Sequence, residues 1–352
     1  MALRARTLTV MTLATSLALT LAACSGGSGG DNASGSKSGK YVLGVSNTLV
    51  GNGWREEMIC AVKAQALASG KVSKVVSTNR NGGPTEQIAD LRSLISQGVN
   101  AIIVDPSDGT KLNDVIDEAK AKGITVVSVD SQVTDKNAYN VTNDQEKYGR
   151  LGGEALAKLL DGKGNVVEMR GAAGVPADTD RHKGFTEALQ KYPNIKIVKQ
   201  TFTGWDNTVG GQQALDVLNG SQKVDGIWTS GIDYTVVNAF DTLHMSPVPV
   251  IGADNNAFVG MLLNDPKVKG AAVSNPAAVG AVGAAIALQV LEGKKVDRNT
   301  LLTPEVWTKS DTDQLKAHYF AEKDPTYSTS VQVKPYTTYT NDQLFACKGP
   351  GE

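Results

Sequence analysis

The sequence predicts an α/β protein with two doubly wound lobes, each built on a parallel sheet, joined by a hinge of three chain crossovers. Two observations predict this class. From Tyr41 onward, short β-branched runs alternate with amphipathic stretches of helical length, and the alternation restarts near residue 144. Near-continuous apolar strands separated by helices indicate a parallel sheet covered on both faces. Two successive sets of similar size therefore indicate two lobes with a cleft between them.

The first set contains four strand candidates and three helix candidates. The strand candidates are YVLGVSN (41–47), VSKVVST (72–78), AIIVD (101–105) and ITVVSVD (124–130). The helix candidates lie between them at 54–69, 84–97 and 110–122. In the second helix candidate, Ile88, Leu91 and Leu94 follow the helical period, which places one apolar stripe against the sheet. A glycine follows each helix candidate, where helices commonly stop.

The second set repeats the pattern of the first. Its strand candidates are NVVEMR (165–170), IKIVKQTFT (195–203), DGIWTS (225–230) and VPVIGAD (248–254). The helix candidates are near 144–161, 177–191, 207–219 and 233–243. A further strand (269–275), a helix rich in small residues (277–292) and a strand LLTPEVW (301–307) follow. These elements complete a second lobe and return the chain to the first.

This pattern predicts the segments of the chain. We expect a first lobe of residues 41–142 and 275–306, a second lobe of residues 143–274, and a hinge crossover with an extended C-terminal tail over 307–352. The three crossovers are predicted near 141–144, 273–277 and 304–309. Tyrosines and prolines interrupt the α/β rhythm in the tail, so we expect it to lie over the lobes.

The first 40 residues predict export and attachment to a membrane. Two arginines precede an apolar run that ends in Leu21-Ala22-Ala23-Cys24, which is typical of a lipoprotein signal peptide (1–23) whose Cys24 becomes the lipid-bearing first residue. An uncleaved anchor is the alternative, although the run is short for a spanning helix. Residues 24–40 are rich in Gly and Ser and predict a flexible tether. We therefore expect a protein on the outer face of the cytoplasmic membrane.

Composition excludes several classes of function. The chain has 35 basic and 36 acidic residues, which gives no electrostatic case for a nucleic-acid partner or a polybasic membrane patch. No second long apolar segment follows the signal, so a permease subunit is not expected. His182, His244 and His318 stand far apart, without the spacing of metal ligands. We expect no metal, no cofactor and contact with the membrane through the lipid alone.

Two cysteines remain once Cys24 carries a lipid. Cys60 and Cys347 form an even pair in an oxidising compartment, which favours a disulfide that ties the tail to the first helix. The alternative is two unrelated thiols, with Cys60 buried and Cys347 exposed.

Polar residues end several of the apolar strands. Asn47, Asp105, Asp130, Asp254 and Asn275 all occupy such positions. In doubly wound folds, ligands bind beyond the carboxyl ends of the strands. Each residue by itself is also explained as a cap of the helix that follows. The whole set favours a pocket that forms hydrogen bonds with a ligand.

An ordered set of short stretches carries a family resemblance. These are VSNTLVGNGW, IIVDPSDG, VVSVDSQ, VTNDQEKYG, GVPADTDRHKGF, TGWDN, VIGADNN and VSNP. From about Tyr41 to Trp307, the chain resembles type I periplasmic sugar-binding proteins of the ribose-binding group, which serve ABC importers. The resemblance implies the type I periplasmic binding protein fold.

The resemblance also implies ligand-binding residues in the first lobe. The segment that lies over the sugar in this family offers Asn47, Asn52 and Trp54 here. At the end of the fourth strand, the family has an Asp-Arg pair that grips hydroxyl groups. This chain has Asp130 followed by Ser131, so a bidentate guanidinium is missing and ribose itself is in doubt.

In the second lobe and at the hinge, the matching positions are Arg181, Trp205, Asp233, Asp254 and Asn275. The family has an asparagine near Asp233, which is a second departure. Carboxylates can accept hydrogen bonds from neighbouring hydroxyls, and indole rings can lie against the C–H faces of a sugar ring.

Other structural roles remain open for some of these residues. Either tryptophan could belong to the core or to the interface between the lobes. Arg181 could form an ion pair with Asp178 or Asp180. Trp228 lies inside a strand candidate and is expected in the core.

These observations predict a monomeric solute-binding lipoprotein that captures a sugar or polyol by lobe closure and delivers it to an ABC permease. A sugar-sensing lipoprotein without transport is the main alternative, because it needs the same cleft. A repressor of the lac type would need a helix-turn-helix before Tyr41 and no export signal. An exported glycosidase could use Asp130 and Asp254 as its carboxylate pair, yet the chain lacks hydrolase motifs, so we expect no enzyme.

Overall fold

The computed structural model describes residues 40–352, all of which belong to one compact unit. The predicted signal peptide, Cys24 and residues 24–39 of the tether lie outside the described residues. Within 40–352, no helix has both the length and the apolar character that a bilayer span requires.

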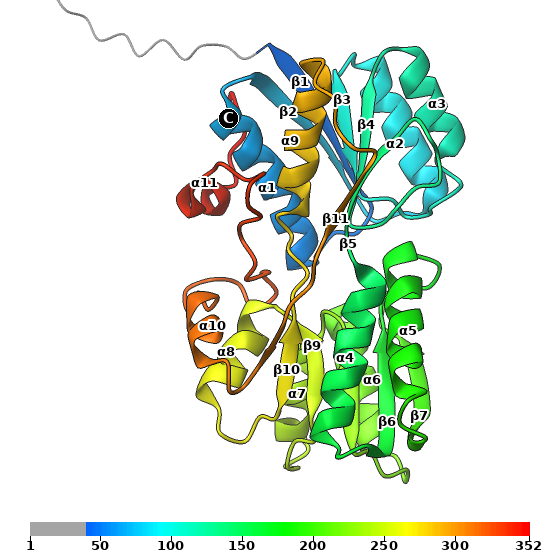
Figure 1. Cartoon of the computed structure of the whole chain (residues 1–352), viewed down its shortest axis with the longest axis vertical. Coiled ribbons are helices and arrows are strands. Elements are labelled where there is room, and N and C mark those ends of the chain that lie inside the picture. Colours follow the sequence, from blue (N-terminus) through cyan, green and yellow to red (C-terminus); the bar gives the residue numbers. More distant parts are fainter. Residues whose placement is uncertain (1–39) are drawn as a thin grey trace, which may run out of the picture. The chain divides into compact units, whose positions relative to one another are not determined.

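The first lobe is built on a six-stranded parallel sheet with the strand order β11-β5-β4-β3-β1-β2 (Figure 1). Its strands are β1 (Tyr41–Asn47), β2 (Val72–Asn79), β3 (Ala101–Val104), β4 (Thr125–Val129), β5 (Tyr139–Asn143) and β11 (Asn299–Leu302). Its helices are α1 (Gly53–Ser69), α2 (Pro84–Ser96), α3 (Asn113–Ala121) and α9 (Val279–Leu291).

Helices cover both faces of this sheet, which explains why its strand β3 is apolar throughout. Ile103 packs in a core cluster with residues of α1 and α9, such as Met58. Its neighbour Ile102 packs in another cluster with residues of α2 and α3, such as Leu94. Successive side chains of a strand point to opposite faces, so each residue of β3 meets an apolar layer. All four residues of β3 are buried.

The second lobe has a second six-stranded sheet, in the order β12-β10-β9-β8-β6-β7. Its strands are β6 (Lys163–Arg170), β7 (Asn194–Phe202), β8 (Gly226–Thr229), β9 (Val250–Ala253), β10 (Gly270–Val273) and β12 (Val306–Thr308). Its helices are α4 (Gln145–Leu159), α5 (Pro176–Leu189), α6 (Asn207–Leu218), α7 (Asp233–Thr242) and α8 (Asn256–Asn264). The strands run parallel except β12, which pairs with β10 in the antiparallel direction.

The chain passes between the two sheets three times (Figure 1). It passes after β5 into α4, after β10 into α9, and between β11 and β12. These passages fall where the sequence predicts crossovers. The predicted two-lobed α/β class is confirmed.

Three sequence expectations differ from the structure. The predicted strand 301–307 is two strands in different sheets, because residues 303–305, which include Pro304, carry the chain across. The sequence analysis did not predict β5 or α8. β5 is short and mixes Tyr, Asn and Thr with one Val, so it lacks an apolar run.

The C-terminal tail is only partly extended. It contains α10 (Thr312–Ala317) beside α8 and α11 (Asn341–Ala346) beside α1, so its ends lie on different lobes (Figure 1). A disulfide joins Cys347, at the end of α11, to Cys60 of α1. Between the two helices, residues 325–331 form a segment that we call the strap.

Candidate ligand-binding site

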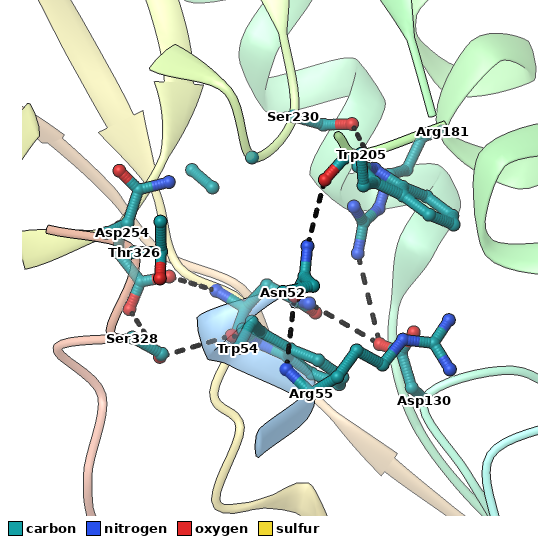
Figure 2. A pocket seen from close by; sticks show the side chains of 14 residues that line it. Asn52, Trp54, Arg55, Asp130, Arg181, Trp205, Ser230, Asp254, Thr326 and Ser328 are labelled. Atoms are coloured by element: carbon teal, nitrogen blue, oxygen red, sulfur yellow. Dashed lines mark hydrogen bonds and ion pairs between the residues drawn. The ribbon is translucent and has the colours of Figure 1, made fainter. Parts of the chain in front are cut away.

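A pocket lies between the lobes, where the strand ends of the two sheets meet. The empty space between its lining residues is about 530 Å³, part of it open to solvent. It is lined by Asn52, Trp54, Arg55, Asp130, Arg181, Trp205, Ser230, Gly231, Ala253, Asp254, Asn255, Asn275, Thr326 and Ser328 (Figure 2).

The start of α1 presents three of these side chains. Asn52 is the N-cap, and its side-chain oxygen accepts a hydrogen bond from the Arg55 backbone N–H at 3.1 Å. The cap fixes the first turn, so Trp54 and Arg55 point in defined directions. The indole N–H of Trp54 donates to the carbonyl oxygen of Asn275 at 2.6 Å, which ties this turn to the second crossover.

Arg55 is a pocket residue that sequence reasoning missed. Its guanidinium carbon lies 6.0 Å from the ring centroids of both Trp54 and Trp205, so it stands near an indole from each lobe. It forms a buried ion pair with Asp105 and donates to Asn47 at 3.2 Å. The sequence does not show which way Arg55 faces, because Glu56, Glu57 and Lys63 of the same helix are charged as well.

Asp105 is fully buried at the end of β3. Burial raises its pKa to about 7, and the guanidinium of Arg55 acts in the opposite direction. Asp105 lies behind the lining residues, and its ion pair holds the guanidinium of Arg55 in place.

Asp130 lies at the edge of the first sheet, directly after β4. Its backbone adopts the left-handed conformation, with φ of 61°, which costs free energy in a non-glycine residue. One carboxylate oxygen accepts a hydrogen bond from Gln145 at 2.9 Å and lies 3.9 Å from the Arg181 guanidinium. The strained turn thus aims a buried carboxylate at the second lobe.

Arg181 of α5 is buried and faces the first lobe. Its Nε donates to the Gln145 side chain at 2.7 Å, and its guanidinium lies 4.4 Å from the centroid of the Tyr148 ring. The alternative pairing with Asp178 does not occur, because Asp178 binds Arg170 at 2.6 Å.

Trp205 contributes the second indole from the turn between β7 and α6. It is 8 % exposed and has φ of 56°, so it is a second strained residue in the pocket. Its carbonyl oxygen accepts a hydrogen bond from the Asn52 side chain at 3.1 Å, which is a direct contact between the lobes.

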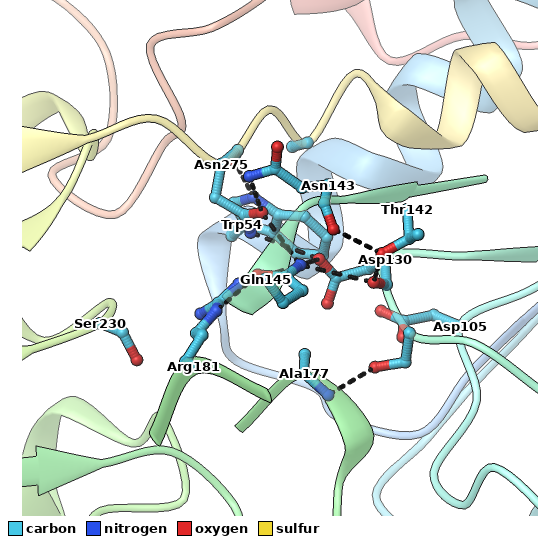
Figure 3. A network of polar contacts seen from close by, with 12 residues as sticks. Trp54, Asp105, Asp130, Thr142, Asn143, Gln145, Ala177, Arg181, Ser230 and Asn275 are labelled. Carbon is cyan, nitrogen blue, oxygen red and sulfur yellow. Dashed lines mark hydrogen bonds and ion pairs between the residues drawn. The ribbon is translucent and has the colours of Figure 1, made fainter. Parts of the chain in front are cut away.

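A network of buried amides joins the crossovers to the pocket (Figure 3). Asn143 donates to the side-chain oxygen of Asn275 at 3.1 Å, and Asn275 in turn lies 3.4 Å from Asp130. The backbone N–H of Asn275 donates to Asp254 at 2.8 Å. Residues at two crossovers therefore connect the pocket carboxylates of both lobes.

Seven of the ten predicted ligand residues line the pocket, namely Asn52, Trp54, Asp130, Arg181, Trp205, Asp254 and Asn275. The other three are buried behind it. Asn47 holds Arg55, and Ser131 accepts a hydrogen bond from the Ala177 N–H of the second lobe at 3.3 Å. Asp233 accepts from Asn255 at 2.6 Å, and burial raises its pKa to about 6. Asn47 and Asp233 therefore support the lining residues Arg55 and Asn255, whereas Ser131 contacts the backbone of the second lobe.

Asp254 directly follows β9 and faces the pocket from the second lobe. Within residues 40–352, no cluster of three or more His, Cys, Asp or Glu side chains has the arrangement of a metal site. The pocket instead gathers carboxylates, guanidinium groups, amides and indoles from both lobes.

Residues 43–295 match the family described as the periplasmic binding protein domain. The chain belongs to this family. It is 26 % identical over 328 residues to the xylitol-binding protein of Mycolicibacterium smegmatis, covering 92 % of each chain. It is 25 % identical to the ribose import binding protein of Bacillus subtilis, over 74 % of this chain and 84 % of that one. A solved ABC transporter solute-binding protein from Thermobispora bispora superposes with a TM-score of 0.75 at 25 % identity, over 87 % of this chain and 94 % of that one.

The family match confirms the resemblance that the sequence motifs predict. Periplasmic binding proteins are extracytoplasmic binding proteins and not enzymes, so the prediction of a binding protein is confirmed as well. The lipid anchor, the monomeric state and the segment boundaries stay predictions.

Proposed function

We propose that this periplasmic binding protein captures a small sugar or polyol between its lobes and delivers it to an ABC importer. The observation that carries the proposal is the composition of the pocket. Trp54 and Asp130 come from the first lobe, and Trp205 and Asp254 come from the second lobe. A neutral ligand with many hydroxyl groups matches this set, because carboxylates accept from hydroxyls and indoles pack on C–H faces.

The relatives support the same class of ligand. By name, they bind xylitol and ribose. The chain has Ser131 where ribose-binding proteins have an arginine, and Arg55 brings a guanidinium into the same half of the pocket from α1. We therefore propose that the ligand differs from ribose in the arrangement of its hydroxyl groups.

Lobe closure is the proposed mechanism of capture. Contacts across the cleft already exist in this structure, from Asn52 to the Trp205 carbonyl and from Ser131 to the Ala177 N–H. A ligand that contacts both lobes favours the closed state by its differential affinity for that state. Closure also buries the ligand, so a hydroxyl without a partner lowers affinity and provides selectivity. We further propose that Cys24 carries the lipid that keeps the protein beside its permease.

A thermal-shift screen of the purified protein tests the ligand class. The panel contains xylitol, D-ribose, D-galactose and myo-inositol, with L-leucine and spermidine as chemically different controls. A ligand at 100 times its Kd stabilises the native state by about 2.7 kcal/mol, which corresponds to a rise in Tm of several degrees for a chain of this size. A screen in which no sugar or polyol raises the Tm contradicts the proposal.

Solute uptake tests the role in transport. Deletion of the gene should abolish high-affinity uptake of the compound that gives the largest shift in Tm. Re-expression of the wild-type chain should restore it, and the Arg181→Ala variant should not. Uptake that persists unchanged in the deletion strain favours a sensing role without transport.

A further inference from the structure

The strap forms part of the pocket although it lies outside the family match. Thr326 and Ser328 line the pocket, whereas the matched domain ends at residue 295. The strap therefore adds binding-site residues that the shared domain does not supply.

The strap is hydrogen bonded to both lobes. The backbone N–H of Ser328 donates to the buried carboxyl group of Glu57 in α1 at 2.7 Å. On the other side, the N–H groups of Asn256 and Ala257 donate to the carbonyl oxygens of Tyr327 and Pro325, at 2.8 and 3.1 Å. These bonds fix the path of the strap along the pocket.

The strap also holds the carboxylate of Asp254. The Ser330 N–H donates to Oδ2 of Asp254 at 3.1 Å, and the Thr329 N–H donates to the Asp254 carbonyl at 2.9 Å. Hydrogen bonds from N–H groups to a carboxylate are among the stronger ones in proteins. The strap thus sets the direction in which the Asp254 carboxylate faces the pocket.

The Ser328 hydroxyl is buried without a short hydrogen bond. Ser328 is 1 % exposed, and its Oγ lies 3.4 Å from each of the Asp254 carboxylate, the Asn275 carbonyl and the Ala277 N–H. Hydroxyl hydrogen bonds are normally 2.5–3.0 Å long. A ligand hydroxyl at this wall of the pocket would give Ser328 a partner at normal distance (Figure 2).

The start of α1 is shaped to receive the strap. A Cβ atom on Gly53 would lie 1.8 Å from Oγ1 of Thr326, which no side chain tolerates. Gly53 sits between the pocket residues Asn52 and Trp54, so the strap approaches the ligand site at its first-lobe edge. The absence of a side chain at this position is explained by the close approach.

We propose that the strap is a third wall of the ligand site, in which Ser328 and Thr326 bind ligand hydroxyl groups and the strap backbone orients Asp254. This inference rests on the proposed function, since it takes the ligand to be a sugar or polyol. The strap selects among such ligands, because a compound that lacks the matching hydroxyl leaves the Ser328 hydroxyl with only its three long contacts of 3.4 Å.

Calorimetric titration of the purified protein tests the strap. The titrant is the member of the xylitol, D-ribose, D-galactose and myo-inositol panel that gives the largest shift in Tm. Ser328→Ala and Thr326→Val remove one hydroxyl each and should weaken binding about three- to tenfold, the usual effect of one lost hydrogen bond. Gly53→Ala should weaken binding at least tenfold, because it displaces the strap. Glu322→Ala, at an exposed position just before the strap, is the matched control and should bind like the wild type.

The outcomes separate this inference from the proposed function. If the wild type binds no member of the panel, both are overturned. If the wild type binds and both hydroxyl variants stay within twofold of it, the function stands and the strap is not a wall of the site. The unliganded Tm of Ser328→Ala and Thr326→Val should stay within about 2 °C of the wild type. A loss of affinity that accompanies a general loss of stability would make the strap structural and overturn the inference.

Discussion

The two lobes hold their halves of the pocket in different ways. In the first lobe, Arg55 is held by Asn47, the last residue of β1, and by Asp105, which directly follows β3 of the same sheet. In the second lobe, Asp254 is held by the strap, which reaches it from the far end of the chain. The first half is therefore built by one sheet and its helix caps, whereas the second half needs a segment outside the shared domain. We therefore expect different substitutions to disrupt the two halves of the pocket.

The largest expected effect is in the first lobe, at the buried ion pair. Asp105→Asn leaves the Arg55 guanidinium without its anionic partner inside the protein, which typically costs about 3–5 kcal/mol. Urea unfolding at pH 8 measures this cost. The matched control is Glu118→Gln, which breaks the exposed pair with Arg92 and should cost less than about 1 kcal/mol. Equal effects of the two substitutions would show that Asp105 is not required to hold the first half.

The strap that holds Asp254 belongs to the tail, and the Cys60–Cys347 disulfide fixes the end of this tail to α1. Reduction of the disulfide therefore tests how much the attachment of the tail stabilises the protein. We expect the free energy of unfolding to fall by about 2–4 kcal/mol, because the crosslink restricts the unfolded chain. The double variant Cys60→Ser, Cys347→Ser should match the reduced wild type and should not respond to reductant. If reductant still lowered the free energy of unfolding of the double variant, the loss of stability would not come from this disulfide.

The buried carboxyl group of Asp233 predicts a pH dependence in the second lobe. Its folded-state pKa is raised from 3.8 to about 6, so the native state keeps a proton that the unfolded chain releases. Its contribution to the free energy of unfolding is therefore full below about pH 4 and is lost as the pH rises through about 6. Relative to Asp233→Asn, the wild type should lose about 2–3 kcal/mol between pH 4 and pH 7.

Asp108 of the first lobe provides a control of opposite sign. The backbone N–H groups of Lys111 and Thr110 lower its pKa to about 2. The stability that Asp108 contributes is therefore present above the ordinary pKa of an aspartate and is lost as the pH falls towards 2. If Asp233→Asn and Asp108→Asn changed the pH profile in the same direction, the assignment for Asp233 would be wrong.

A smaller effect is expected where two helices of the second lobe touch. A Cβ atom on Gly184 of α5 would lie 1.8 Å from the Glu146 carbonyl of α4. Gly184→Ala should destabilise the protein by about 1–3 kcal/mol and weaken ligand binding, since Arg181 lies one turn earlier on the same helix. Gly349→Ala, whose Cβ would meet ordinary contacts, should change neither quantity appreciably. Unchanged affinity in Gly184→Ala would show that Arg181 keeps its position without the close helix pair.

The predictability of the two halves also differs. Trp54 and Asp130 could be assigned from the sequence, because Asp130 directly follows a recognisable strand and Trp54 belongs to a family motif after the first strand. Arg55 could not be assigned from the sequence, because its side chain reaches the pocket only through the orientation of the first turn of α1. Ser328 and Thr326 lie in a segment without strong periodicity, so the sequence offers no signal that they approach the site.

The errors in predicting secondary structure from the sequence also arise where contacts distant in sequence decide the outcome. β3 is apolar because both of its faces are covered, so its pattern identifies it. β5 is polar and short, and its pairing with β4 and β11 determines that it is a strand. The run 301–307 looks continuous in sequence, and only the position of the two sheets divides it into β11 and β12.

The sequence by itself determined the α/β alternation, the two lobes and the polar strand ends, because these follow from local periodicity and from burial of each strand between helices. The tertiary structure alone decided which side chains meet in the pocket. Ser328 meets Glu57 across 271 residues of chain, and Asn52 meets Trp205 across 153. Such contacts depend on how the lobes and the tail pack together, and no local pattern encodes that packing.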